Sequence, residues 1–411
     1  MKRKLTLFAV TFAMGLFVFT QACAQSGRIY GKVYTQDDGV YEGFIRWDDH
    51  ETFWDDILDA AKYGFSESEG EYRQVEKQIE ILGIKISWTQ DEEVDGQRHF
   101  GIRMGRLRSI QRRSRNTAVL ELKDGSCIQV SSSGTDIGSS NRGVVVFDRD
   151  VGRVTVDWSE FEKAIFSPEP ATEVETHADW RLYGAVTAWD GRQFRGFIMW
   201  DNDESLSSDF LDGESRGEDV EIPCSNIRAI QRKSSQSAIV ELTSGKQLTL
   251  RGSNDVSEEN RGIVVEIPHF GKVTLDWGDF ERIEFEKPAP EELRGYEYFD
   301  AGEPLFGAVW DDEGQRYQGR IRWDDDEAMT YEFLDGELEG IPVMIEFGDI
   351  ESIQRRSSSS ATVTLKSGET LELTGTCDVN EQNRGIFIEG DGERLVKLDW
   401  DQFDEVKFGR L

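Results

Sequence analysis

Apolar and polar residues alternate in three stretches that each end at a Trp-Asp pair. The stretches are YEGFIRW at residues 41–47, FRGFIMW at 194–200 and YQGRIRW at 317–323. In the first, Tyr41, Gly43, Ile45 and Trp47 share one side of an extended chain. A period of two residues is typical of a half-buried β-strand. Each stretch is therefore predicted to be a strand that carries its Trp on the apolar face.

The same order of motifs follows each of these strands. SIQRRS, AIQRKS and SIQRRS begin at residues 109, 229 and 352; NRG begins at 141, 260 and 383; VDWSEF, LDWGDF and LDWDQF begin at 156, 275 and 398. A unit of this size in three copies indicates tandem modules. Trp200 and Trp277 are 77 residues apart, as are Trp323 and Trp400, whereas Trp47 and Trp158 are 111 apart. The first copy therefore carries an insertion.

Further strand patterns surround the repeated Trp residues. The segments 118–130, 238–250 and 362–373 are apolar runs that turn at Asp-Gly or Ser-Gly, as β-hairpins do. No stretch has the period of an amphipathic helix. The predicted fold class is all-β, with three tandem copies of a small antiparallel β-barrel or sandwich module. The alternative is a single closed, propeller-like ring with two blades per copy, against which the Pro-rich linkers argue.

The motif spacing and the linker composition divide the chain. We predict a signal peptide at 1–24, module 1 at 25–166 with an insertion of about 34 residues near 60–100, a linker at 167–180, module 2 at 181–285, a linker at 286–303 and module 3 at 304–411. The insertion is expected to form a β-hairpin. Pro and Glu dominate both linkers, which predicts that they are exposed.

The N-terminus has the features of an export signal. A basic head of three residues precedes the apolar run 5–19, and Ala22 and Ala24 match the small residues of a cleavage site. The protein is therefore predicted to be periplasmic or extracellular. The alternative is a lipoprotein anchored through Cys23, although the usual aliphatic residue before such a Cys is missing. No later stretch is long and apolar enough to span a membrane.

The charge limits the partners. Lys and Arg number 47 and Asp and Glu number 80, which gives a net charge of −33. Such a polyanion repels nucleic acid and anionic lipid. The expected partner is a protein or glycan of the envelope, and no nucleic acid partner is predicted.

A cluster of acidic residues follows the first Trp of each copy. Clustered carboxylates after a strand are ligands of the kind that Ca²⁺ prefers, so Ca²⁺ is the one cofactor that the pattern suggests. The spacing does not match an EF-hand loop, and the alternative is a solvated turn whose charges meet nearby Arg residues. The candidate ligands are Asp48, Asp49, Glu51, Asp201, Asp203, Glu204, Asp324, Asp326 and Glu327.

A pair of cations also recurs in each copy. In so acidic a chain, repeated pairs are candidates for gripping a carboxylate or sulfate ligand. The alternative is that they neutralise the acidic turns of their own module. The candidates are Arg112, Arg113, Arg232, Lys233, Arg355 and Arg356.

A third polar motif precedes each NRG. Asp136, Asp255 and Asp378 are five residues before the Asn and are predicted to cap a single helical turn. The Arg of each NRG is expected to pair with the Asp of the closing Asp-Trp motif, at Asp157, Asp276 or Asp399.

Catalytic motifs are missing from the sequence. The four His residues occupy unrelated places, and no nucleophile elbow, zinc helix or phosphate loop is present. Triplication favours binding, since repeated weak sites gain avidity. The predicted function is an exported, non-enzymatic repeat protein that binds or scaffolds in the envelope or outside the cell. The alternative is a hydrolase of envelope or extracellular polysaccharide that uses Asp and Glu carboxylates.

Overall fold

All strand pairing in the computed structural model is antiparallel. The structure describes residues 26–63, 74–81, 84–91, 97–170, 179–288, 293–390 and 395–409. The predicted signal peptide with Cys23, most of the first linker and parts of the insertion lie outside the described residues. Within the described ranges, no helix is long and apolar enough to cross a membrane.

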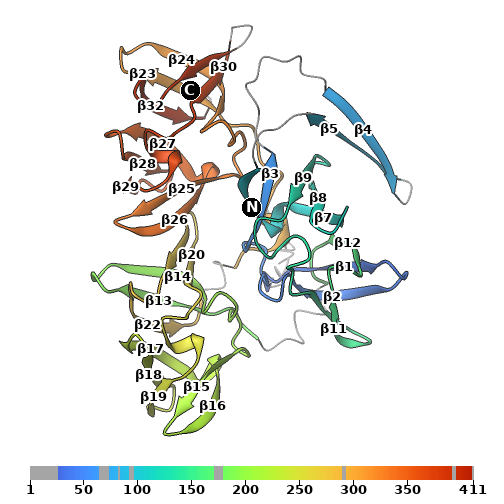
Figure 1. Ribbon diagram of the computed structural model, residues 1–411, viewed down its shortest axis with the longest axis vertical. Coiled ribbons are helices and arrows are strands. Elements are labelled where there is room, and N and C mark those ends of the chain that lie inside the picture. The colour runs from blue at the N-terminus through green and yellow to red at the C-terminus, as the bar shows by residue number, and fades with distance from the viewer. Residues whose placement is uncertain are drawn as a thin grey trace, which may run out of the picture.

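Each of the three modules contributes ten strands to large sheets, and the predicted all-β, three-module fold is confirmed (Figure 1). Module 1 contains β1 (Tyr30–Thr35), β2 (Val40–Arg46), β3 (Ile57–Tyr63), β6 (Gln97–Arg103), β7 (Leu107–Arg112), β8 (Thr117–Leu122), β9 (Cys127–Ser131), β10 (Val144–Asp148), β11 (Gly152–Val156) and β12 (Phe161–Phe166), with a 3₁₀ turn at Met104–Arg106. Between β3 and β6, the strands β4 (Gln74–Ile81) and β5 (Ile84–Asp91) pair as a separate hairpin.

Modules 2 and 3 repeat this order of elements. Module 2 contains β13 (Tyr183–Ala188), β14 (Gln193–Met199), β15 (Phe210–Ser215), β16 (Glu218–Pro223), β17 (Ile227–Ser234), β18 (Ser237–Leu242), β19 (Gln247–Arg251), β20 (Ile263–Ile267), β21 (Gly271–Leu275) and β22 (Phe280–Glu286), with 3₁₀ turns at Cys224–Asn226 and Asn254–Val256. Module 3 contains β23 (Phe306–Asp311), β24 (Arg316–Arg322), β25 (Phe333–Leu338), β26 (Ile341–Glu346), β27 (Ile350–Arg355), β28 (Ala361–Leu365), β29 (Thr370–Leu373), β30 (Ile386–Glu389), β31 (Val396–Leu398) and β32 (Phe403–Phe408), with 3₁₀ turns at Tyr296–Tyr298, Phe347–Asp349 and Cys377–Val379.

The sheets remain open, and one of them crosses a module boundary. The strand orders are β11-β10-β2-β1-β12-β7-β8-β9-β3-β6, then β16-β15-β19-β18-β17-β22-β13-β14-β20-β21-β26-β25, and β29-β28-β27-β32-β23-β24-β30-β31. None is closed into a barrel. The hairpin β25–β26 of module 3 extends the sheet of module 2 through β21. The ring alternative required two separate blades per copy, and the described strands do not form them.

The repeated Trp residues form the centre of each module, as the alternation predicted. Trp200 is 1 % exposed and packs edge to face against Phe280, with ring centroids 5.2 Å apart. The equivalent pairs are Trp47 with Phe161 and Trp323 with Phe403. Such aromatic pairs contribute beyond their buried area. The apolar cores of modules 2 and 3 also merge into one cluster, so these modules are not independent units.

A buried Arg joins all three modules. Arg103, at the end of β6, is 1 % exposed. Its Nε donates to Glu346 of module 3 at 2.7 Å, and its Nη1 lies 2.6 Å from Glu266 of module 2. The same Nη1 donates to the carbonyl oxygen of Asp55 in module 1 at 2.7 Å. A buried charge is tolerated when it is paired and hydrogen-bonded, so this contact ties the modules into one body.

Other ion pairs and one linker reinforce that junction. Arg181 of module 2 pairs with Asp55 and Asp56 of module 1, and Lys62 of module 1 pairs with Glu332 of module 3. Part of the second linker, around Tyr296, packs on module 1, whereas its composition predicted an exposed segment. Tyr296 is 8 % exposed and donates its hydroxyl to the carbonyl oxygen of Leu107 at 3.0 Å. The aromatic ring of Tyr296 is buried against apolar side chains of module 1. This burial outweighs the exposure that the neighbouring Pro and Glu residues favour.

The Gly that stands four residues before the first repeated Trp of each module lies where two strands approach closely. A Cβ atom at Gly319 would lie 2.0 Å from the carbonyl oxygen of Glu389 in β30. We expect Gly319→Ala to lower the free energy of unfolding by roughly 1–3 kcal/mol, because backbone must move to admit the methyl group. Urea unfolding measures this change. Gly278→Ala is the control, since nothing lies within 4 Å of its Cβ position; equal effects of the two changes would contradict the close approach.

Candidate metal centre in the repeated acidic turns

Each acidic cluster lies in a tight reversal closed by its flanking Trp and Glu. The Trp200 N–H donates to the Glu204 carbonyl at 2.8 Å, and the Glu204 N–H donates back at 2.9 Å. The first two turn residues, Asp201 and Asn202, have φ values of 50° and 62°. Asp and Asn adopt positive φ more readily than other residues with a side chain. The local sequence therefore accounts for the turn even without a ligand.

The first carboxylate of each turn points inward and meets the Arg of the NRG motif. Asp201 is fully buried; the backbone N–H of Arg261 donates to its Oδ1 at 2.6 Å, and the guanidinium to its Oδ2 at 2.6 Å. Arg142 and Arg384 make the same contacts with Asp48 and Asp324. The expected pairing with Asp157, Asp276 or Asp399 is therefore wrong. The Arg pairs with the turn Asp instead, because the turn Asp is buried beside the backbone N–H of the Arg.

The Asp that precedes NRG joins this cluster, which the sequence interpretation missed. Asp255 Oδ2 accepts the backbone N–H of Asp212 at 2.6 Å. Its carbonyl oxygen accepts the indole N–H of Trp200 at 3.0 Å. The predicted capping role is wrong, because Asp255 lies inside the 3₁₀ turn, whose N-terminal residue makes no side-chain cap. The constant distance of this Asp from NRG was the available signal.

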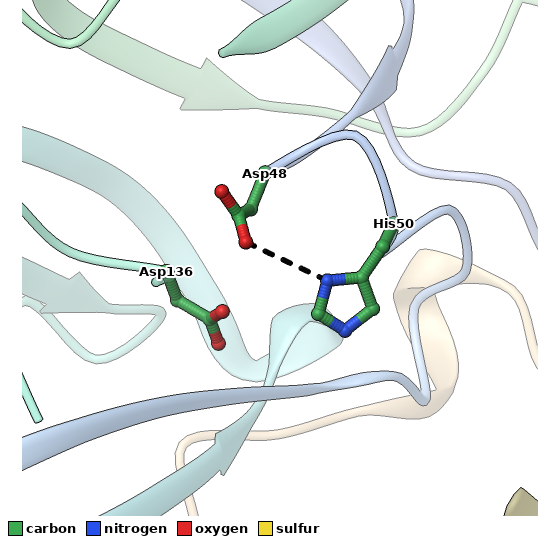
Figure 2. A group of neighbouring side chains, drawn as sticks. All are labelled: Asp48, His50 and Asp136. Atoms are coloured by element: carbon green, nitrogen blue, oxygen red, sulfur yellow. Dashed lines mark ion pairs between the residues drawn. The ribbon is translucent and has the colours of Figure 1, made fainter. Parts of the chain in front are cut away.

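The carboxylates converge in all three modules. The candidate ligand atoms of each of four groups lie within 4.8 Å of one another. The groups are Asp201, Glu204 and Asp255; Asp324, Asp326 and Glu327; Asp324, Cys377 and Asp378; and Asp48, His50 and Asp136 (Figure 2). Among the predicted ligands, Asp49 points elsewhere: its side chain is 45 % exposed and lies 3.7 Å from Arg153.

The convergence raises the proton affinity of several carboxylates. Burial, together with the charges of Asp203 and Asp255, raises the pKa of Glu204 to about 11. Burial raises the pKa of Asp255 and of Asp324 to about 7. Burial and the charge of Asp378 raise the pKa of Glu327 well above its usual range. Like charges at such distances disfavour one another's ionised form, so these groups hold either protons or a cation.

One oxygen of the turn Glu lacks a donor in each copy. The Oε2 atoms of Glu51, Glu204 and Glu327 are buried and have no hydrogen-bond partner. The Oε1 atom of Glu51 lies 2.8 Å from His50 Nε2. A buried polar atom without a partner is costly. The hydrogen-bond partner is missing at the same atom in all three copies, so this feature is a property of the module.

Module 1 differs because His50 stands where the other copies have Asp203 and Asp326. The imidazole lies 2.8 Å from Glu51 and 3.7 Å from Asp48, and Figure 2 shows its ion pair with Asp48. Burial disfavours its charged form, but the charge of Glu51 and hydrogen bonds with Asp48 and Glu51 prevail. They raise the pKa of His50 from 6.5 to about 10. The guanidinium Nη2 of Arg142 also lies 2.8 Å from His50 Nδ1, so module 1 places both an imidazole and a guanidinium in the cluster.

The basic pairs lie apart from the acidic turns. Arg112 donates to the carbonyl oxygen of Ser159 at 3.2 Å, and Arg232 to that of Gly278 at 2.8 Å. Arg356 pairs with Glu372 at 3.4 Å. The alternative that these pairs neutralise the acidic turns of their own module finds no support in these contacts. Their ligand-binding role stays a prediction.

One cavity between modules 1 and 2 is small and charged. It encloses about 150 Å³ and is lined by Glu51, Asp136, Arg181, Glu266 and Lys272, among others. Pockets that bind small molecules usually measure roughly 300–1,000 Å³. The cavity is therefore too small for a glycan, and its carboxylates serve the junction between modules.

Comparisons of this chain with protein-family models, with curated proteins and with solved structures found no match.

Proposed function

We propose that this protein is an exported, non-enzymatic scaffold of the cell envelope or the extracellular space, which presents one repeated surface to a protein or glycan partner. The observation that carries this proposal is the buried contact of Arg103 with Glu266 and Glu346, which ties module 1 to the other two modules. Because the modules cannot swing apart, the repeated surfaces keep a constant spacing. Weak sites at constant spacing gain avidity without any new contact.

The basic pairs are the part of that surface that we assign to the partner. They occupy equivalent places in the three modules, and Lys233 and Arg356 are exposed. Guanidinium groups bind carboxylate and sulfate in a forked geometry. The favoured partner therefore carries such groups, as an acidic glycan does. Because the chain is so negative overall, binding depends on these local cations.

The test uses the whole mature chain, since modules 2 and 3 share a core. We expect the chain to bind immobilised alginate or dextran sulfate and not uncharged dextran. Changing one, two or three basic pairs to Gln should weaken binding stepwise, by about tenfold or more for each module. Surface plasmon resonance measures the affinities.

A matched control separates local contacts from net charge. The double change Arg216→Gln and Lys246→Gln removes the same charge from module 2 as Arg232→Gln and Lys233→Gln, at exposed positions outside the basic pair. The control should keep the wild-type affinity. Equal losses in the two variants, or no binding to either acidic polymer, would contradict the proposal.

A further inference from the structure

We propose that the acidic turns of modules 2 and 3 each bind one Ca²⁺ ion, whereas His50 occupies the equivalent place in module 1. The inference goes beyond the proposed scaffold function and does not depend on it. It also revises the sequence-based expectation, which placed candidate metal ligands in all three modules.

The donor set of module 2 fits a hard divalent cation. Asp201, Glu204 and Asp255 converge, and Asp203 shares the guanidinium of Arg261 with Asp201. Arg46 of module 1 does not compensate this charge, because it pairs with Asp209 and with the backbone carbonyl of Asp203. Ca²⁺ takes six to eight oxygen ligands and binds carboxylates in monodentate or bidentate fashion. The carboxylates of the site outnumber the cations that surround them.

Module 3 repeats this donor set with one difference. Asp324 converges with Asp326 and Glu327 and, in a second group, with Cys377 and Asp378. Arg384 pairs with Asp324 and Asp326, and the guanidinium of Arg98 from module 1 lies 3.9 Å from Asp326. Cys377 stands where module 2 has Asn254, and its sulfur lies 3.8 Å from Asp378. Oxygen donors still dominate, so the same ion is expected. Lys62 of module 1 contacts only the backbone carbonyl of Asp326 in this turn and forms its ion pair with Glu332.

An independent observation points to a ligand rather than to crowding alone. Glu327 is 9 % exposed, and its Oε2 has no hydrogen-bond partner although its carboxylate belongs to the converging group. The Oε2 atoms of Glu204 in module 2 and of Glu51 in module 1 also lack a hydrogen-bond partner, but the other carboxylate oxygen of Glu51 lies 2.8 Å from His50 Nε2. A buried oxygen without a donor, aimed at other carboxylates, is satisfied by a cation at their centre. Arg384 does not satisfy it, because its guanidinium contacts Asp324 and Asp326.

Module 1 shows what fills this place when no ion is bound. The third turn residue is His50 instead of Asp. One of its ring nitrogens faces Asp48 (Figure 2), and the other lies 2.8 Å from Glu51. The imidazole lies beside Glu51 and Arg142, in the place at which the other two copies have a further carboxylate. The chain therefore contains two forms of the cluster, one with a His and two with an Asp as the third turn residue.

The test counts ions on the mature chain, residues 25–411, after it has been stripped with a chelator. Calorimetric titration with CaCl₂ should give two sites. Tb³⁺ luminescence excited through Trp should report the same number, because Trp200 and Trp323 adjoin the turns. Glu204→Gln and Glu327→Gln should each remove one site, and the double variant should bind none. Glu218→Gln, at an exposed position, is the control and should keep both sites.

A gain of binding provides the sharpest outcome. His50→Asp should raise the number of sites from two to three. The isosteric Gln variants decide the question if His50→Asp fails to fold, and circular dichroism checks all variants. Absence of Ca²⁺ binding at millimolar concentration, three sites in the wild type, or two sites in either Gln variant would overturn the proposal. Binding of Mg²⁺ in preference to Ca²⁺ would overturn the assignment of the ion.

Discussion

Arg103→Met is expected to lower the free energy of unfolding by about 3–5 kcal/mol, because it leaves Glu266 as a buried charge without its ion-pair partner and takes from Glu346 one of its two guanidinium partners, Arg106 being the other. The Arg103 side chain is 1 % exposed, and the two carboxylates are almost as buried. Met has a similar length and keeps much of the packing, so the loss reflects the charge. Urea unfolding of the mature chain, followed by Trp fluorescence, measures it.

Two comparisons isolate the origin of that loss. Arg251→Met is the matched control, since Arg251 is 63 % exposed and pairs with Glu214 at the surface; its change should cost no more than about 1 kcal/mol. Adding Glu266→Gln to Arg103→Met should restore part of the stability, because it removes the stranded charge. If Arg103→Met and Arg251→Met behaved alike, Arg103 would not be the contact that joins the modules.

His50→Gln is expected to destabilise the protein in a pH-dependent way. The pKa of His50 is about 10 in the folded protein, above its unfolded value of 6.5. The imidazolium therefore stabilises the fold fully below pH 6.5, and this contribution declines as the pH rises and is gone above pH 10. A raised pKa of this size corresponds to roughly 5 kcal/mol.

The measurement is the difference in unfolding free energy between the wild type and His50→Gln across pH. The difference should be largest near pH 6 and should vanish near pH 10.5. His269→Gln serves as the control, because the His269 side chain is 62 % exposed and its change should leave stability nearly the same at every pH. A constant difference for His50→Gln would mean that the lost contact is uncharged.

The strands and the buried Trp residues could be predicted because they depend on local pattern. Alternation placed Trp47, Trp200 and Trp323 on the apolar face, and all three are buried. The role of Asp255 could not be predicted in this way. An Asp before a short turn is a frequent cap, and only the approach of Asp212 from β15 offers it a better donor. Contacts between residues distant in sequence decide such competition.

The Arg of the NRG motif illustrates the same limit. Its pairing with Asp157, Asp276 or Asp399 was expected from strands that are neighbours in sequence. In the structure, Arg261 reaches Asp201, which is sixty residues earlier in the chain and fully buried. Charge alone does not determine which of the many Asp residues pairs with the Arg. Burial determines it, since an ion pair shielded from water is stronger than an exposed one.

The sequence by itself determined the repeated module: the strand order, the core Trp residues, the Asp-rich turn that accepts positive φ, and the Gly where strands approach closely. These follow from side-chain period and backbone sterics, which act over a few residues. The tertiary structure alone decided that the sheets stay open, that β26 extends the sheet of module 2, and that Arg103 joins three modules. It also decided which carboxylates meet, because burial and charge pairing depend on chain segments that only folding brings together.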